Sequence, residues 1–443
     1  MFRIIKAFLF PVFVLFVGFL SWAGQQTAEP PFPVKQYTLK NGLKIILSED
    51  NSLPIVSVVV AYHVGSTHEE KGKTGLAHLL ENLMFQGSRN VGRMQHYSFI
   101  QKIGGSLNAI TTADKTIFYQ TVPSNQLALV LWLESDRMNS LNISPFNVEN
   151  TKKDIIENIQ LRKESDPYLE NSWDFDRLLF SNFAYGHPVL GSAQDIRNIT
   201  REDVLEFFAT YYSPSNAVLT IVGNFNEQKA MQLIQRYFST IPMRATPPSV
   251  DLGNLPKIQN TEREVENPMA SSPGFYLGYQ LAPRDSEDHY RLAIAEYALM
   301  KGRTSRIFKR LIEKDKTAIS ISGGIETRRG QSVFKIFVKA NNEIMNERNQ
   351  RTVIAEINKI KSSYITEEEL RKIRNMFRMD YLRQFATVLD KAIFLAEELL
   401  DRGNHTQWMD ELDRYLDVTH YNVSRVANIY FKEDKVLLKV KTK

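Results

Sequence analysis

The sequence contains no cysteine among its 443 residues. Disulfide bonds, thiolate metal sites and cysteine nucleophiles are therefore excluded for this chain. The absence says little about the compartment in which the protein works, because a chain of this length can bury a large core without covalent cross-links.

The sequence also lacks a strong excess of charge of one sign. Its formal net charge is +5, which is small for the length, and its hydrophobic and charged fractions of 43% and 24% are those of a globular protein. An excess of this size could favour acidic partners, but lysines spread over a solvated surface explain it better, and no nucleic-acid partner is expected. The length predicts two or more domains.

Long apolar runs are scarce, and the one that stands out lies at the N-terminus. A basic start, "MFRIIK", precedes the 14-residue run "AFLFPVFVLFVGFL". Ser21 and Ala23 then occupy the −3 and −1 positions of a signal-peptidase site. We therefore predict a signal peptide over residues 1–23, a mature chain that begins near Gly24, and a periplasmic or secreted location. The run is short for a membrane-spanning helix, so an uncleaved anchor is the alternative.

The apolar patterns divide the remaining chain into two halves, residues 34–242 and 263–443. Residues 243–262, "MRATPPSVDLGNLPKIQNTE", are rich in proline and polar residues and are interpreted as a linker. Both halves combine strands with helices, which suggests a structural duplication without an obvious sequence repeat. Strands are expected within 34–50, 54–66, 105–123, 217–225, 274–283, 318–340 and 435–442, and long helices at about 345–362, 366–384 and 387–402.

A short motif lies in the segment "GKTGLAHLLENLMFQGS", residues 72–88, which is predicted to be helical. His78, Glu81 and Asn82 stand at positions i, i+3 and i+4, so they share one side of a helix. With histidine in place of Asn82, the motif would read H-x-x-E-H, the inverted form of a zinc-protease helix.

Several further blocks appear in the same order as in one known family. The chain resembles the insulinase/pitrilysin family of zinc peptidases, particularly its shorter two-domain members, such as the mitochondrial processing peptidase subunits and bacterial periplasmic homologues. The resemblance implies an α+β fold of two homologous domains, each a mainly antiparallel sheet packed with helices, which face each other across a cleft. The blocks span about residues 35–320 and are "GKTGLAHLLENLMFQGS", "GGSLNAITTADKTIFYQTVP", "LALVLWLESDRM", "AYGHPVLGSAQDI", "FFATYYSPSNAVLTIVGNF" and "GRTSRIFKRLIEKDKTA".

The resemblance assigns roles to the motif residues. In the family, both histidines and a glutamate on a later helix hold zinc, and the glutamate of the motif is the general base. His78 matches the first ligand, Glu81 the base and Asn82 the second ligand, while the third position falls on Asn158. Glu157 would take that position only if the helix register moved by one residue, a rotation of about 100° away from the metal.

Two amides in ligand positions predict weak or absent zinc binding. An amide oxygen is a neutral donor that suits calcium better than zinc. We therefore expect no zinc-dependent hydrolysis by this chain alone, with His78 and Glu81 inherited and hydrogen-bonded locally. A misplaced third ligand, or a ligand supplied by a neighbouring chain, would leave an active zinc endopeptidase with an unusual ligand set. A site that takes another metal is a further alternative.

Substrate-binding residues are also implied by the resemblance. Asn108, Ala109 and Thr111 match a family strand whose free edge takes the substrate peptide as an additional strand. An ordinary internal strand is the alternative. Arg374 and Tyr381 lie seven residues apart on a predicted helix and match a family pair that holds the substrate backbone, although a solvated arginine and a packed tyrosine would give the same pattern.

Other residues carry weaker signals. Gly302 is the one glycine that remains in a stretch matching a glycine-rich family loop, and this stretch lacks the pattern of a phosphate-binding loop. Among the remaining histidines of the first half, none forms a second metal-spaced pair with His78, and the one in "YGHPVLG" is interpreted as structural. These four are His63, His68, His96 and His187.

Three functions follow from these observations. The first is a non-catalytic subunit that pairs with an active insulinase-family chain, or with a second copy of itself, and helps to bind a peptide or unfolded polypeptide. The second is an active zinc metalloendopeptidase with an unusual ligand set. The third is a peptide-binding or chaperone-like protein without chemistry. A membrane contact is expected only through an uncleaved signal segment.

Overall fold

The computed structural model describes residues 32–180, 182–250, 252, 257–403 and 408–443. The expected signal peptide, residues 1–23, lies outside the described residues. Among the described helices, none combines the length and the apolar character that a membrane crossing requires.

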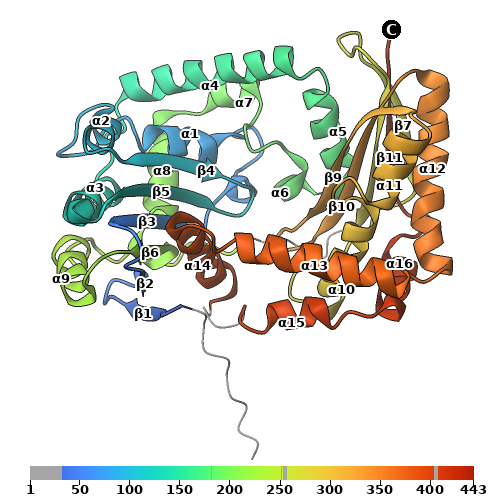
Figure 1. The fold of residues 1–443 in the computed structure, drawn as a ribbon. Helices are drawn as coiled ribbons and strands as arrows, with labels where there is room; N and C mark the ends of the chain where they lie inside the picture. Colours follow the sequence, from blue (N-terminus) through green and yellow to red (C-terminus); the bar gives the residue numbers. More distant parts are fainter. Residues whose placement is uncertain (1–31, 181, 251, 253–256, 404–407) are drawn as a thin grey trace, which may run out of the picture.

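The first half of the chain forms a mixed sheet with the strand order β1-β2-β6-β3-β5-β4 (Figure 1). Neighbouring strands are antiparallel except β2 and β6, which run parallel. The two central strands are buried on both faces, which explains the nearly continuous apolar run between residues 55 and 62. The strands are β1 (Lys35–Thr38), β2 (Lys44–Glu49), β3 (Ile55–Tyr62), β4 (Ser106–Thr111), β5 (Thr116–Pro123) and β6 (Ala217–Gly223).

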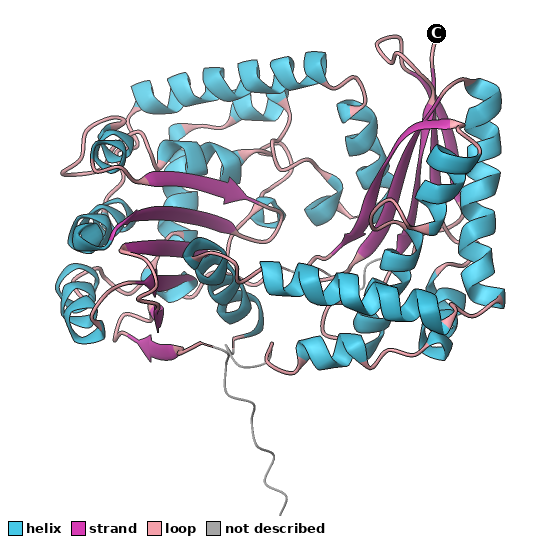
Figure 2. Cartoon of the chain, viewed as in Figure 1, coloured by secondary structure: helices cyan, strands magenta, loops and turns pink. Residues whose placement is uncertain are grey.

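The second half forms another mixed sheet, with the order β7-β11-β8-β10-β9. Only the β7–β11 pair is parallel. The predicted α+β class, with two mainly antiparallel sheets packed with helices, is confirmed (Figure 2). One strand was not expected, because β7 begins inside the segment interpreted as a linker. The strands are β7 (Thr261–Glu266), β8 (Gly274–Gln280), β9 (Ala318–Glu326), β10 (Val333–Ala340) and β11 (Val436–Lys441).

Helices cover both sheets. In the first half, α1, α3, α8 and α9 bury their apolar residues with one face of the sheet. The helices of this half are α1 (Leu76–Leu83), α2 (Gln95–Lys102), α3 (Leu127–Asn139), α4 (Pro145–Ser165), α5 (Leu169–Phe180), α6 (Phe183–Gly186), α7 (Ala193–Asn198), α8 (Arg201–Tyr211) and α9 (Glu227–Phe238).

In the second half, α10, α12, α13 and α16 share one core with the second sheet. The segment after Ser305 is α-helical only over Arg306–Phe308 and continues as a π-helix over Lys309–Lys314. The helices are α10 (Glu287–Leu299), α11 (Arg306–Phe308), α12 (Glu343–Ser362), α13 (Glu367–Arg383), α14 (Val388–Arg402), α15 (Glu411–Leu416) and α16 (His420–Tyr430).

The two halves exchange helices. Helix α14 belongs to the second half of the sequence but packs on the other face of the first sheet, against β3 and β6 (Figure 1). Helix α5 belongs to the first half but packs against β8 and β11 of the second sheet. Each sheet therefore has one face covered by the other half of the chain, and neither half can bury its apolar surface alone.

Because the halves exchange helices, truncating a buried side chain on α14 should strongly destabilise the fold. Leu395 is fully buried in the core that α14 shares with the first sheet, so Leu395→Ala should lower the free energy of unfolding by about 2–5 kcal/mol. Leu382→Ala is the matched control, since Leu382 is 52% exposed on α13 and should change stability by less than about 0.5 kcal/mol. Denaturant unfolding measures both. Equal effects of the two substitutions would contradict a structural role for the exchange.

Candidate functional site

Helix α1 carries the H-x-x-E-N motif. Its apolar residues face the core, whereas His78 and Glu81 have 21% and 12% of their side-chain surface exposed. The helix starts at Gly75, whose φ of +91° places it in the left-handed region that glycine tolerates best. The motif side chains are therefore presented from a rigid element at the surface of the first half.

Asn82 turns its amide toward the helix backbone. Its Nδ2 donates to the carbonyl oxygen of His78 at 2.8 Å and lies 3.4 Å from Nε2 of the same residue. The carbonyl can only accept, so this contact assigns the NH₂ group to the side that faces the imidazole. An N–H donor cannot coordinate a cation. On its other side, Nδ1 of His78 lies 3.4 Å from Oε2 of Glu81, the local contact expected for an inherited pair.

Asn158, the residue expected at the third ligand position, is engaged in another contact. Asn158 is exposed on α4, and its Oδ1 accepts a hydrogen bond from Nε of Arg162 at 2.9 Å. Glu157 instead lines a surface groove with Ala193 and Arg197 of α7. Among the described residues, no three His, Cys, Asp or Glu side chains are close enough together to hold a metal ion. The donors present at these positions do not fit a catalytic zinc site, which needs three protein ligands.

The N-terminus of α1 is anchored by a residue that the sequence reasoning missed. Glu69 is fully buried, and its carboxylate accepts the backbone N–H groups of Gly75 and Ala77, each at 2.8 Å. Nε2 of His187 lies 3.1 Å from the same carboxylate. A carboxylate at this position complements the unpaired N–H groups and the dipole of the helix. His187 therefore has the structural role expected for it, and the only sequence signal for Glu69 is an acidic residue shortly before the helix start.

This anchor predicts a pH dependence of stability. Burial lowers the pKa of His187, but the hydrogen bond and the charge of Glu69 outweigh burial and raise the pKa above its ordinary value. A raised pKa in the folded state stabilises the fold fully below the unfolded value of about 6.5, and the contribution is lost as pH rises through the folded value. The stability difference between wild type and His187→Gln should therefore shrink as pH increases.

Urea unfolding at several pH values measures this difference, which is about 1.4 kcal/mol for each unit by which the pKa is raised. His420→Gln is the matched control, because His420 is exposed at the start of α16. A difference between wild type and His187→Gln that stays constant with pH, or grows as pH rises, would contradict the role of His187.

The strand that carries Asn108, Ala109 and Thr111 is an edge strand. Strand β4 pairs with β5 and lies at the end of the sheet order. Asn108 is exposed, whereas Ala109 and Thr111 are partly buried on the opposite face. Helix α1 contacts β4, so the motif and the free edge lie next to each other. An unpaired row of backbone N–H and C=O groups can accept a further strand.

Arg374 and Tyr381 make contacts within the second half. Nη2 of Arg374 donates to the carbonyl oxygen of Val418 at 3.0 Å. The hydroxyl group of Tyr381 donates to the carbonyl oxygen of Trp408 at 2.9 Å, and its side chain is buried. Both residues therefore fix α13 to the segment that follows α14.

The other residues singled out from the sequence lie in separate places. Gly302 precedes α11 and adopts a φ of +71°. His96 is buried with Nε2 3.3 Å from Oε1 of Gln120. His68 packs its ring against Tyr211. His63 contacts Arg329 of the second half.

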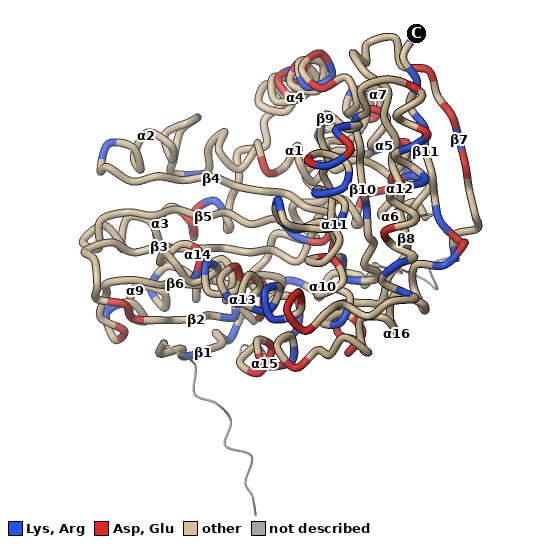
Figure 3. Tube along the Cα trace, turned by 45° about the vertical axis from the view of Figure 1, so that its right-hand side comes forward, with Lys and Arg blue, Asp and Glu red and all other residues tan. Residues whose placement is uncertain are grey.

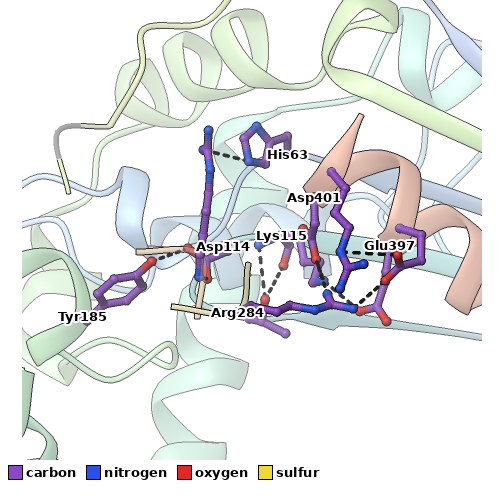
Figure 4. A network of polar contacts seen from close by, with 11 residues as sticks. His63, Asp114, Lys115, Tyr185, Arg284, Glu397 and Asp401 are labelled. Carbon is purple, nitrogen blue, oxygen red and sulfur yellow. Dashed lines mark hydrogen bonds and ion pairs between the residues drawn. The ribbon is translucent and has the colours of Figure 1, made fainter. Parts of the chain in front are cut away.

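A charged cavity of about 570 Å³ lies where the two halves meet (Figure 4). Lys115, in the turn after β4, pairs with Glu397 at 3.0 Å and with Asp401 at 2.7 Å on α14. Arg284 pairs with Asp401 at 3.4 Å and with Glu398. Charges of both signs mix over α13, α14 and their neighbours rather than separating by sign (Figure 3). Sequence reasoning could not assemble this network, because its members are far apart along the chain.

Comparisons with known proteins agree with the resemblance. Residues 44–172 match the family model described as "Insulinase (Peptidase family M16)", and residues 198–377 match the one described as "Peptidase M16 inactive domain". A zinc protease of Helicobacter pylori, PqqE, is 27% identical over 406 residues, which cover 89% of this chain and 90% of the relative.

Solved structures show the same architecture. A crystal structure of a protease from Helicobacter pylori superposes with a TM-score of 0.88 at 26% identity and covers 93% of this chain and 99% of that one. A peptidase M16 inactive domain from Pseudomonas fluorescens superposes with a TM-score of 0.84 at 17% identity, covering 93% and 98% of the two chains, and so supports the fold alone.

Proposed function

The chain is a two-domain, peptidase-like member of the insulinase family, and we propose that it acts as a non-catalytic subunit that pairs with an active zinc endopeptidase and helps to bind its peptide substrate. The observation that carries this proposal is the amide of Asn82. It places an N–H donor beside His78, where the active members of the family have a second imidazole.

Loss of the metal would remove the chemistry of the general base. In active members the glutamate of the motif deprotonates a zinc-bound water, whose pKa the metal lowers. Glu81 keeps its place on α1, but the residues around it do not supply the three ligands that zinc requires. Glu81 alone has no activated water to deprotonate.

The retained edge strand supports a role in binding peptides. A substrate segment that pairs with β4 would gain main-chain hydrogen bonds, and its alternate side chains would lie beside α1 or on the opposite face of the sheet. Asn108, Ala109 and Thr111 line this edge. An active partner would cleave the peptide that this chain helps to hold.

The N-terminal sequence supports an exported location for the protein. The basic start, the 14-residue apolar run and the small residues after it support export to the periplasm or beyond. The same segment, if retained, would anchor the protein to the membrane. The active partner would have to be exported as well.

The ligand assignment can be tested by restoring the family residues. The double variant Asn82→His/Asn158→Glu should bind about one zinc per chain, because it supplies the missing imidazole and carboxylate. Metal analysis after dialysis measures the content. Adding Glu81→Gln to the double variant should keep the zinc but give no peptide hydrolysis. A folded double variant that remains free of metal would show that Asn158 is not the third position.

The subunit role predicts a partner-dependent activity. This chain should co-purify with an exported chain that carries an intact H-x-x-E-H motif, and the pair should cleave peptides at least about tenfold faster than the partner alone. Peptide turnover by the separate and mixed chains measures the effect. Peptide affinity without turnover or a partner would instead favour a chaperone-like protein. A monomer that neither binds such a chain nor changes its activity would contradict the proposal.

A further inference from the structure

The turn between β9 and β10, residues 327–332, belongs to the second half and contacts residues of the first. The backbone N–H of Arg329 donates to Oδ2 of Asp114 at 3.1 Å. Gly330 donates its N–H to the hydroxyl oxygen of Tyr185 at 3.0 Å, and that hydroxyl donates to Oδ1 of Asp114 at 2.9 Å. Asp114 and Tyr185 therefore hold the β9–β10 turn by hydrogen bonds to its backbone.

The side chain of Arg329 makes a contact that depends on the charge of a histidine. Its Nη1 lies 2.9 Å from Nε2 of His63. A guanidinium group is always protonated and can only donate, so Nε2 must accept and His63 must be neutral, with its proton on Nδ1. Asn216 accepts from the backbone N–H of His63 at 3.1 Å and donates to its carbonyl oxygen at 3.2 Å, so the backbone that carries the ring is fixed beside the turn.

The charged and titratable groups around His63 come from every element packed against it. Asp114 and Asp401 favour its charged form, and Arg329 and Lys115 favour the neutral form. The ring of His68, whose centroid lies 6.1 Å from that of His63, is also titratable, and burial, followed by the charge of His63, lowers its pKa to about 4. Both acids are already engaged, since Asp114 accepts from Tyr185 and the turn, and Asp401 pairs with Lys115 and Arg284. Burial, followed by the charge of Arg329, lowers the pKa of His63.

We propose that the β9–β10 turn is an acid-released latch between the two halves, because protonation of His63 removes the acceptor of Arg329 and places two positive groups against each other. The geometry fixes the direction in which docking of the turn depends on pH. Docking requires neutral His63, so the latch is closed at neutral pH and opens as pH falls below the ordinary histidine value of about 6.5.

The latch lies close to the edge of β4 that is proposed to bind peptides. Asp114 and Lys115 lie in the turn between β4 and β5, and the cavity of about 570 Å³ lies between them, the β9–β10 turn and α14. Release of the turn would open this cavity near the end of β4. This consequence rests on the proposed binding of peptides to β4, whereas the latch itself does not.

Hydrogen–deuterium exchange of the full chain tests the latch. After correction for the intrinsic rate, the peptide containing residues 327–332 should lose protection between about pH 7.5 and 5.5, by up to about tenfold for each pH unit below the histidine value. His63→Gln keeps an oxygen acceptor but cannot become charged, so its protection should not change with pH. His420→Gln, an exposed histidine on α16, should respond like the wild type.

A second variant keeps the test decisive if His63→Gln does not fold. Arg329 is exposed, so Arg329→Gln should fold, and it should also abolish the acid response because it removes the positive partner of His63. Protection of the turn that does not change with pH in the wild type would overturn the latch, as would an acid response that persists in either variant.

Peptide association separates the latch from the proposed function. The association rate of an extended peptide should rise several-fold at about pH 5.5 in the wild type and remain constant in His63→Gln. Equal rates at both pH values, despite a released turn, would overturn the regulatory role. Absence of peptide binding at every pH would contradict the proposed function, while the exchange experiment would still decide the latch.

Discussion

The packing of α14 on the first sheet is the interaction on which the rest of the structure depends. A mixed sheet that is apolar on both faces needs two covering layers, and the first half of the chain supplies only one. The second half supplies the other layer and in return receives α5 on its own sheet. The two shared cores therefore tie the halves together, and the ion pairs of Lys115 and Arg284 with α14 form at the resulting junction.

The same constraint holds the degenerate motif in place. Helix α1 is packed on the first sheet and anchored by Glu69 and His187, so its side chains are presented at a fixed place beside β4. On this helix, the NH₂ group of Asn82 faces the carbonyl oxygen and the imidazole of His78. The helix and the sheet are those of the family, and the edge of β4 beside the helix is the proposed site of peptide pairing.

Local patterns were sufficient for the family and the fold class. Six blocks in order predicted a two-domain insulinase-family protein, which the family matches and the similar structures confirm. The central strands and the long helices of the second half follow from runs and periods of apolar residues. The edge position of β4, which the sequence left open, was settled only by the sheet order.

What the sequence could not predict depends on contacts between distant segments. Helix α14 was recognised as a helix, but no local signal indicates that it packs on the sheet of the other half. Strand β7 was not predicted, because its residues are polar and its first two lie in the segment interpreted as a linker, and it forms only by pairing with β11. The contact between His63 and Arg329 joins residues 266 positions apart, so no motif contains both.

The central claim is that the chain keeps the scaffold of a zinc peptidase without the ligands for zinc. The most direct test is the zinc content of the purified wild-type protein after equilibration with zinc and dialysis. The account predicts less than about a tenth of a zinc ion per chain, because only one of three ligand positions retains a side chain suited to the metal. About one zinc ion per chain, together with peptide cleavage that Glu81→Gln abolishes, would contradict it.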